Sequence, residues 1–333
     1  MKYNINVDDW YSEAVLKKAQ GYSNRKIAVM LFDNKNYRNR LNTFFKQESV
    51  VEDVKKKEKE LEIQGEVNSS YKTPKIEHTQ PVICYLDIEC SPTKSYTWRR
   101  FKENISQAQI LSESFFLTAS WAFNEGEVEG IRLTPNEALD EDDEALVTKL
   151  WHVLDNSSVV IGHNLRKFDI RKINSRFAYY HLPPTTPYKI IDTLEIAKAK
   201  FAFPSNKLND LCEYLGIGEK LPHDGFDLWK RCCNGDEAAL IHMLSYNKVD
   251  VSITRDLYKR LRNFDNNAVN LAIMSDNVGS LCTTCCSDNI SVLENKFAFT
   301  PNGKYQVYVC NSCGTKLRAT SRIGISNKLV RVV

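Results

Sequence analysis

Two acidic residues lie two positions apart at the end of an apolar segment. Residues 82–86 are apolar and lead directly into Asp87-Ile88-Glu89. Side chains two positions apart in an extended strand point to the same face, so we expect Asp87 and Glu89 to project together. An exposed acidic strand end is the alternative, but the apolar segment indicates a central strand. Because a divalent cation relieves the repulsion between two adjacent carboxylates, the pair predicts a cation site, and its oxygen ligands suit Mg²⁺ or Mn²⁺.

Two further acidic residues lie in segments that predict helices. Asp169 follows the apolar segment 158–162 and is expected at the start of a helix that continues to about residue 180. By itself, an acid at this position indicates only a favourable interaction with the helix dipole. Asp250 follows Tyr246 by four residues, and positions four apart share one face of a helix. We therefore expect Tyr246 and Asp250 to point into the same space.

The order of these segments resembles the DEDD superfamily of 3′–5′ exonucleases. The motifs are Asp-x-Glu on a strand, His-Asn-x₃-Phe-Asp at residues 163–169, and Tyr-x₃-Asp on a late helix. The tyrosine is typical of the tyrosine subclass, as in the proofreading domains of DNA polymerases, and Ser245 stands where the histidine subclass has its histidine. The resemblance covers roughly residues 81–264 and includes 207–217, which looks like the helix after the second motif. His163 is interpreted as a supporting residue, and a role as a metal ligand is the alternative.

This resemblance implies a role for each residue of the site. Asp87 would bridge two cations, and Glu89 and Asp250 would help to hold the ion that generates hydroxide. Asp169 would act on the second ion, directly or through a water molecule. Tyr246 would orient the attacking water, because its phenol is too weakly acidic to be a base at neutral pH. The implied reaction is hydrolysis of phosphodiester bonds from the 3′ end with two Mg²⁺ or Mn²⁺ ions.

DNA is the favoured substrate of such an enzyme. A 3′–5′ exoribonuclease with the same chemistry is one alternative. A DNA-binding regulator with a vestigial nuclease site is another, although an unused cluster of repelling acids has a cost in stability. No polymerase motif is visible, so we expect a free-standing nuclease or a subunit, with a replication or repair protein as a candidate partner.

Four cysteines near the C-terminus form two Cys-x₂-Cys pairs. The pairs are Cys282 with Cys285 and Cys310 with Cys313, and together they offer four thiolates to one tetrahedral Zn²⁺. With the alternating segment 304–309, they resemble a zinc ribbon, in which the zinc would be structural because no coordination position stays open. Cys286 could replace Cys285, but the spacing favours Cys285. The other five cysteines lack ligand spacing and are expected to be simple thiols: Cys84, Cys90, Cys212, Cys232 and Cys233.

The segments around these residues predict an α/β fold. Apolar or alternating stretches predict strands over residues 82–86, 115–122, 127–133 and 158–162. A helix is expected near residues 141–154, and helices dominate from the last strand to about residue 261. This order predicts a ribonuclease-H-like mixed sheet flanked by helices. We expect the nuclease domain over 81–264 and the zinc ribbon over 278–320.

The first 47 residues predict a small helical module. Helices are expected near residues 9–20, 23–31 and 35–45, and the last two have helix-turn-helix form; the segment 21–32 resembles the second helix of that superfamily. A helical hairpin that packs on the main domain is the alternative. Residues 48–80 predict a charged linker, and a helix at the start of this segment is an alternative that the pattern allows. The candidate nucleic-acid contacts are Lys35, Arg38 and Arg40 of this module and Arg318 after the last cysteine pair.

Charge and hydropathy restrict the classes of function. The net charge is +3, with nine basic against five acidic residues over 1–50 and seven against four over 265–333. Basic ends favour nucleic acid as a partner. No apolar run reaches the roughly 18 residues of a membrane span, and the first ten residues show no signal segment. We therefore expect a cytoplasmic protein without a membrane partner.

Overall fold

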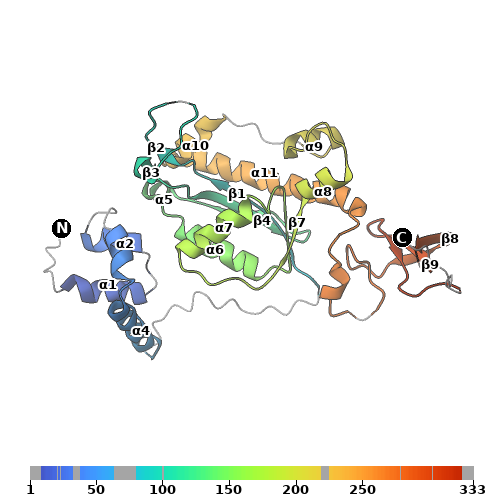
Figure 1. Cartoon of the computed structure of the whole chain (residues 1–333), viewed down its shortest axis with the longest axis horizontal. Coiled ribbons are helices and arrows are strands. Elements are labelled where there is room, and N and C mark those ends of the chain that lie inside the picture. The colour runs from blue at the N-terminus through green and yellow to red at the C-terminus, as the bar shows by residue number, and fades with distance from the viewer. Residues whose placement is uncertain are drawn as a thin grey trace. The chain divides into compact units, whose positions relative to one another are not determined.

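The chain divides into two compact units, Met1–Pro74 and Lys75–Val333 (Figure 1). The structure is a computed structural model, and it describes residues 9–20, 22, 24–32, 38–63, 80–99, 101–218, 225–277, 279–301 and 303–324.

The described part of the first unit is helical. Its helices are α1 (Asp9–Ala19), α2 (Asn24–Phe32), α3 (Arg38–Phe44) and α4 (Glu48–Ile63). A small core joins α1, α2 and α3 through Ala14, Ile27, Ala28, Leu31 and Leu41. Helix α4 occupies the start of the segment expected as a linker, and the Tyr11 hydroxyl donates a hydrogen bond of 2.5 Å to Asp53 of this helix. Lys35 and the side chains of Arg38 and Arg40 lie outside the described residues.

A five-stranded mixed sheet forms the centre of the second unit, in the order β5-β4-β1-β6-β7. Its strands are β1 (Ile83–Cys90), β4 (Phe116–Phe123), β5 (Glu129–Arg132), β6 (Val159–Gly162) and β7 (Lys189–Asp192). Strand β4 is antiparallel to both β1 and β5, whereas β6 is parallel to both β1 and β7. The predicted mixed sheet, with its central first strand, is therefore confirmed.

Strand β7 was not predicted, since the sequence pattern indicates only helices in this region. The strand has four residues and begins with the exposed Lys189, so it shows neither a long apolar run nor clear alternation. Its place in the sheet depends on pairing with β6. Two shorter strands, β2 (Lys94–Ser95) and β3 (Ile110–Ser112), form a separate ribbon in the chain between β1 and β4.

Helices cover both faces of the sheet. They are α5 (Pro135–Asp140), α6 (Glu144–Asp155), α7 (Asp169–Tyr179), α8 (Thr193–Lys200), α9 (Leu208–Leu215), α10 (Phe226–Cys233) and α11 (Glu237–Leu261). Figure 1 shows the long α11 on one side of the sheet and α6 with α7 on the other. Leu86 of β1 lies in the core with Leu150 of α6, whereas its neighbour Tyr85 lies in the core with Val251 of α11. Strand β1 is therefore buried from both sides, as a central strand must be.

A buried ion pair joins three elements on the α6–α7 side. Asp143 has no exposed surface, and its carboxylate accepts hydrogen bonds from the Phe116 backbone N–H (2.7 Å) and the Tyr180 hydroxyl (2.6 Å). The same carboxylate forms an ion pair with Arg176 of α7. A buried charge is tolerated only when it is paired and hydrogen-bonded, and Asp143 meets both conditions. The contacts link the start of β4 to α6 and α7.

The C-terminal cysteines lie in or next to a three-stranded antiparallel sheet, in the order β10-β9-β8. The strands are β8 (Ile290–Thr300), β9 (Gly303–Cys310) and β10 (Lys316–Arg318). Asn263 connects this sheet to the end of α11: its side-chain amide donates to the Cys313 carbonyl (2.9 Å) and accepts from the Thr315 hydroxyl (2.7 Å).

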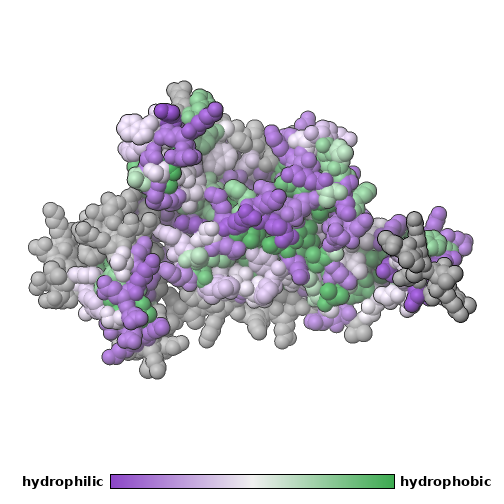
Figure 2. All heavy atoms as spheres, viewed as in Figure 1, coloured by the Kyte–Doolittle hydropathy of each residue, from purple (hydrophilic) through white to green (hydrophobic). Residues whose placement is uncertain are grey.

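The surface is mixed in polarity. Figure 2 shows hydrophilic and hydrophobic side chains interspersed over the visible face. Among the described residues, no helix has the length and apolarity required to cross a bilayer.

Candidate active site and metal centre

Strand β1 extends through both acidic residues of the first motif. Asp87 pairs with Ser120 of β4, and Glu89 pairs with Thr118. Directly paired residues share one face of a sheet, and Ile88 between the acids points into the core on the opposite face. The hydroxyls of Thr118 and Ser120 are buried, and neither has a hydrogen-bond partner among the described residues. The sheet thus presents two carboxylates and two hydroxyls on the face that α11 crosses.

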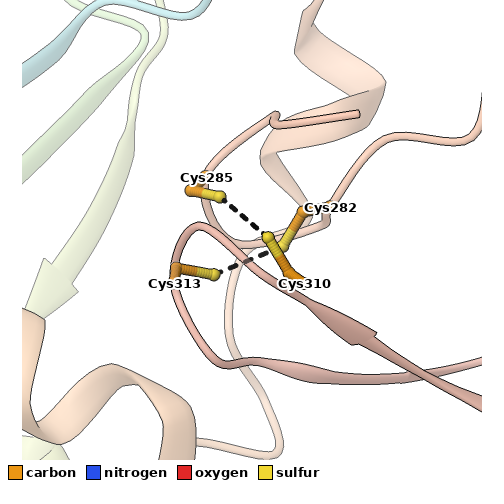
Figure 3. Close-up of side chains that lie close together, drawn as sticks. All are labelled: Cys282, Cys285, Cys310 and Cys313. Carbon is orange, nitrogen blue, oxygen red and sulfur yellow. Dashed lines mark hydrogen bonds between the residues drawn. The ribbon is translucent and has the colours of Figure 1, made fainter. Parts of the chain in front are cut away.

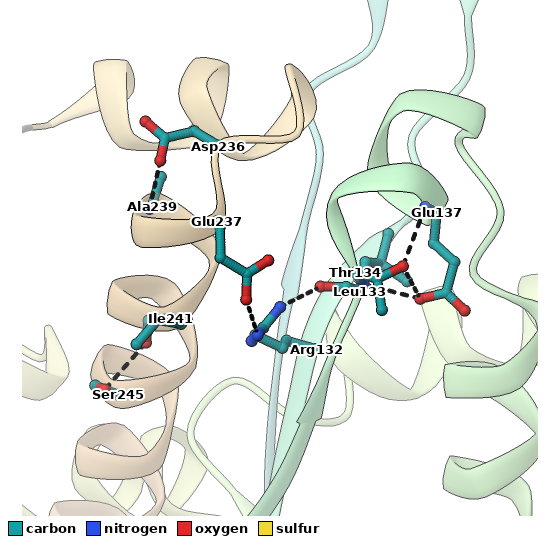
Figure 4. Close-up of polar contacts among 9 residues, drawn as sticks. All are labelled: Arg132, Leu133, Thr134, Glu137, Asp236, Glu237, Ala239, Ile241 and Ser245. Atoms are coloured by element: carbon teal, nitrogen blue, oxygen red, sulfur yellow. Dashed lines mark hydrogen bonds and ion pairs between the residues drawn. The ribbon is translucent and has the colours of Figure 1, made fainter.

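The first turn of α11 is fixed at the edge of the sheet (Figure 4). The Asp236 side chain caps the helix by accepting a hydrogen bond from the Ala239 backbone N–H (3.1 Å). Glu237 forms an ion pair with Arg132 at the end of β5. Gly130 of β5 leaves no room for a side chain, since a Cβ there would lie 2.8 Å from Leu244 of α11. This close approach sets the distance between α11 and the sheet.

Helix α11 brings the last motif to the acids of β1. One carboxylate oxygen from each of Asp87, Glu89 and Asp250 lies within 4.8 Å of the others. Asp250 is buried, and the Asn247 side-chain amide donates a hydrogen bond of 2.6 Å to Asp87. Tyr246 is also buried, and its ring packs edge-on against Trp229 of α10, with 6.5 Å between the centroids. Three carboxylates this close repel each other strongly, and a divalent cation with oxygen ligands fits the group.

Asp169 is adjacent to this group without belonging to it. It is the first residue of α7, it is 3% exposed, and it accepts a hydrogen bond of 3.3 Å from the Ile88 backbone N–H. Burial is the main cause that raises the pKa of Asp169 to about 7; the nearby Asp192 carboxylate acts in the same direction, and the backbone N–H groups of Asp169 and Ile88 act against both. The structure therefore brings three of the four predicted acids together and joins the fourth to them through the backbone between Asp87 and Glu89.

Three supporting side chains complete the surroundings. The Asp192 carboxylate organises the segment that leads to α7, by accepting hydrogen bonds from the backbone N–H groups of Asn164 (2.9 Å) and Arg166 (3.1 Å). The ring nitrogens of His163 lie 2.9 Å from the Thr193 hydroxyl and 3.0 Å from the Asn206 carbonyl. Such contacts suit a supporting histidine. Asn247 and Asp192 were missed by sequence reasoning, although the spacing of three residues between Asn247 and Asp250 could have signalled a shared helix face.

The four predicted zinc ligands converge between the turn at residues 282–286 and the turn that follows β9 (Figure 3). The sulfur of Cys282 lies 3.5 Å from that of Cys313, the sulfur of Cys285 lies 3.6 Å from that of Cys310, and all four lie within 4.8 Å of one another. Four sulfurs at the usual Zn–S distance of about 2.3 Å are about 3.8 Å apart in a tetrahedron, whereas a disulfide needs about 2.05 Å. The arrangement fits a tetrahedral Zn²⁺ and no disulfide.

Each of the two cysteine pairs is followed by a turn of the same kind. Cys286 and Gly314 each follow the second cysteine of a pair, and both have left-handed backbone angles, with φ of 59° and 77°. Their N–H groups donate to the carbonyls of Cys282 (2.9 Å) and Cys310 (2.8 Å). Cys286 is therefore the turn residue of the first pair, and Cys285 is the one that faces the other sulfurs. Burial acts to raise the pKa of Cys310. The N–H groups of Cys313 and Ser312 and the neighbouring thiols outweigh burial, so that the net effect lowers the pKa to about 7.

Arg318 lies exposed on β10, with its guanidinium 4.4 Å from the centre of the Tyr305 ring.

A family comparison agrees with the fold. Residues 111–262 match a family model described as the RNase_H superfamily, and this range includes Asp169, Tyr246 and Asp250 but begins after Asp87 and Glu89. No curated protein matches the chain. A solved structure with some similarity is the family B DNA polymerase from the hyperthermophilic archaeon Pyrobaculum calidifontis, with 14% identity and a TM-score of 0.43 over 55% of this chain. That match covers 25% of the polymerase.

Proposed function

We propose that this chain is a metal-dependent 3′–5′ exonuclease that hydrolyses nucleic acid, with DNA as the favoured substrate. The observation that carries the proposal is the convergence of Asp87, Glu89 and Asp250, with carboxylate oxygens within 4.8 Å of one another on a ribonuclease-H-like sheet. These residues come from β1 and α11, which are far apart in the sequence. Their resemblance to the DEDD motifs supports the 3′–5′ direction.

The carboxylates would hold Mg²⁺ or Mn²⁺, with Asp87, Glu89 and Asp250 as ligands and Asp169 close by. When bound, such ions lower the pKa of water and neutralise the charge that builds on phosphate oxygens. Asn247 fixes the orientation of Asp87 by its hydrogen bond of 2.6 Å. Tyr246 would form a hydrogen bond to the attacking water and orient it, since this residue lies one helical turn from Asp250 on α11.

The direct test is cleavage of end-labelled strands. With Mn²⁺ or Mg²⁺, a 5′-labelled strand should give a ladder that shortens from the 3′ end, whereas a 3′-labelled strand should release only labelled mononucleotide. Parallel DNA and RNA strands identify the preferred substrate. Asp87→Asn should reduce the rate by at least about 10³-fold, because it removes a charge from the metal site.

The matched control is Asp256→Asn, which changes an exposed acid on α11 and should leave the rate unchanged. Wild-type turnover by Asp87→Asn, or no cleavage of any strand by the unaltered chain, would refute the proposed function.

We also infer that the C-terminal sheet holds one structural Zn²⁺ on Cys282, Cys285, Cys310 and Cys313. The separations of 3.5 and 3.6 Å between facing sulfurs support this ligand set. Elemental analysis of protein produced with added zinc should give one zinc per chain. A protein that folds without zinc would contradict the inference.

A further inference from the structure

Three large aromatic side chains are exposed on the loop between β2 and β3, which we define as residues 96–109. Tyr96 is 71% exposed, Trp98 is 93% exposed and Phe101 is 82% exposed. Single exposed aromatic residues are common on protein surfaces, but three within six positions form a cluster that indicates a binding surface. Figure 1 shows that the β2–β3 loop extends outward from the sheet.

The backbone of this loop is held by specific hydrogen bonds. The Glu103 carboxylate accepts from the backbone N–H groups of Trp98 (3.1 Å) and Arg99 (2.6 Å) and from the Gln109 side-chain amide (3.1 Å). Gln109 also forms two hydrogen bonds with Tyr96. Its side-chain amide donates to the Tyr96 carbonyl (3.1 Å), and its backbone carbonyl accepts from the Tyr96 N–H (2.9 Å). The aromatic side chains therefore project from an ordered loop, which lowers the entropic cost of binding.

The charge of the loop points to an anionic ligand. Residues 96–102 contain three basic residues and no acidic one, and the side chains of Arg99 and Lys102 are exposed. Residues 96–109 contain one acid, Glu103, which is engaged with the backbone of the loop. Aromatic rings that alternate with cations match single-stranded nucleic acid, whose unpaired bases stack on the rings while its phosphates meet the cations. A purely apolar protein partner would leave these cations without a counterpart.

The loop is also close in the chain to the candidate active site. Tyr96 follows Glu89 by seven residues, so the two α-carbons are separated by at most about 25 Å even if the chain is fully extended. One short strand can therefore reach both the loop and the carboxylates.

We propose that the β2–β3 loop is a stacking site for unpaired bases. The bases contact the rings of Trp98, Tyr96 and Phe101, and the phosphates contact Arg99 and Lys102. This inference rests on the proposed nuclease function and specifies its substrate as a strand with unpaired bases. The site would hold the strand at a point separate from the reacting phosphate.

Binding measured without cleavage tests the stacking site. We would use the full chain carrying Asp87→Asn, without added Mg²⁺ or Mn²⁺, and follow the fluorescence anisotropy of three labelled probes. The probes are oligothymidine, an abasic strand of the same length, and a blunt duplex. Trp98→Ala should weaken oligothymidine binding about 5-fold to 100-fold, the range expected for loss of one stacked base, and should leave abasic binding unchanged. Trp98→Phe, which keeps a ring, should retain most of the affinity.

Two controls separate stacking from charge and from general surface effects. Arg99→Ala should weaken oligothymidine and abasic binding alike, because both strands keep their phosphates. Tyr214→Ala removes a ring that is 65% exposed on α9 and should change neither affinity.

Equal oligothymidine affinity for Trp98→Ala and its parent would overturn the inference and assign the loop to another partner, such as a protein. Equal losses on oligothymidine and abasic strands would also overturn it. Stacking without cleavage by the unaltered chain would refute only the nuclease function, whereas cleavage without a Trp98 effect would refute only the stacking site.

Discussion

At the scale of single residues, the candidate site combines acids that need different surroundings. Asp87 and Glu89 are partly exposed at the end of β1, whereas Asp169 and Asp250 are 3% and 4% exposed. Exposed carboxylates keep their charge easily, and buried ones keep it only when a cation or hydrogen bonds compensate for lost hydration. A bound divalent cation would supply that compensation, so stability and catalysis are coupled at these positions.

Asp169 gives this coupling a measurable pH dependence. Its pKa in the folded chain is raised to about 7, above the roughly 3.9 of an unfolded chain. Its contribution to stability is therefore fully present below pH about 4 and is lost as the pH rises through about 7. Without added Mg²⁺ or Mn²⁺, and with zinc retained, the wild type should lose up to about 3 kcal/mol relative to Asp169→Asn between pH 4.5 and 8. Thermal unfolding of both proteins across this range measures the difference, and parallel profiles would argue against the raised pKa.

Tyr246 should contribute less to catalysis than the acids do. Tyr246→Phe keeps the ring that packs on Trp229 and removes only the hydroxyl, so the metal site should survive. We expect single-turnover cleavage to slow by about 10-fold to 100-fold, at the lower end of the effect of losing one catalytic hydrogen-bonding group. Because Tyr246 is buried, loss of its hydroxyl should lower the free energy of unfolding by no more than about 1.5 kcal/mol. A loss as complete as that of Asp87→Asn would contradict a supporting role for the hydroxyl.

At the scale of elements, the fixed position of α11 against β5 and β4 brings Asp250 to β1. The Asp236 cap and the Arg132–Glu237 ion pair hold its first turn, and the missing side chain at Gly130 permits close contact with Leu244. The acidic cluster therefore depends on packing well outside the cluster itself.

The turns that follow the two cysteine pairs allow another prediction at this scale. Cys286 has a left-handed backbone at the position where the second cysteine pair has Gly314, and a residue with a Cβ is strained there. Cys286→Gly should therefore retain one zinc per chain and leave thermal stability unchanged or raise it by up to about 1 kcal/mol. The matched variant Cys285→Ser should lose the zinc and unfold the C-terminal sheet. Zinc loss from Cys286→Gly, measured by elemental analysis, would reassign the ligand.

At the scale of the whole molecule, the chain consists of two compact units, and the four acids of the candidate site all belong to the second. Removal of residues 1–74 should therefore leave the rate on saturating short strands nearly unchanged. If the first unit contacts backbone phosphates, binding of long substrates should weaken, and more for duplexes than for single strands, as expected for a helix-turn-helix.

Salt titrations of the full and shortened chains measure this contribution. For every phosphate that the first unit neutralises, its removal should reduce the slope of log affinity against log salt by about 1. Identical affinities and slopes would show that the first unit packs on the main domain or binds a partner protein instead of nucleic acid.

The sequence by itself determined the parts of the protein whose signals are local. The strand that carries Asp87 and Glu89 follows from an apolar segment, the helix that carries Tyr246 and Asp250 from helical spacing, and the cysteine pairs from ligand spacing. Tertiary structure decided the rest. Strand β7 exists through pairing with β6, Asn247 matters through its hydrogen bond to Asp87, and the pKa of Asp169 is raised because folding buries it. None of these can be read from local pattern, because each depends on atoms that only packing brings close.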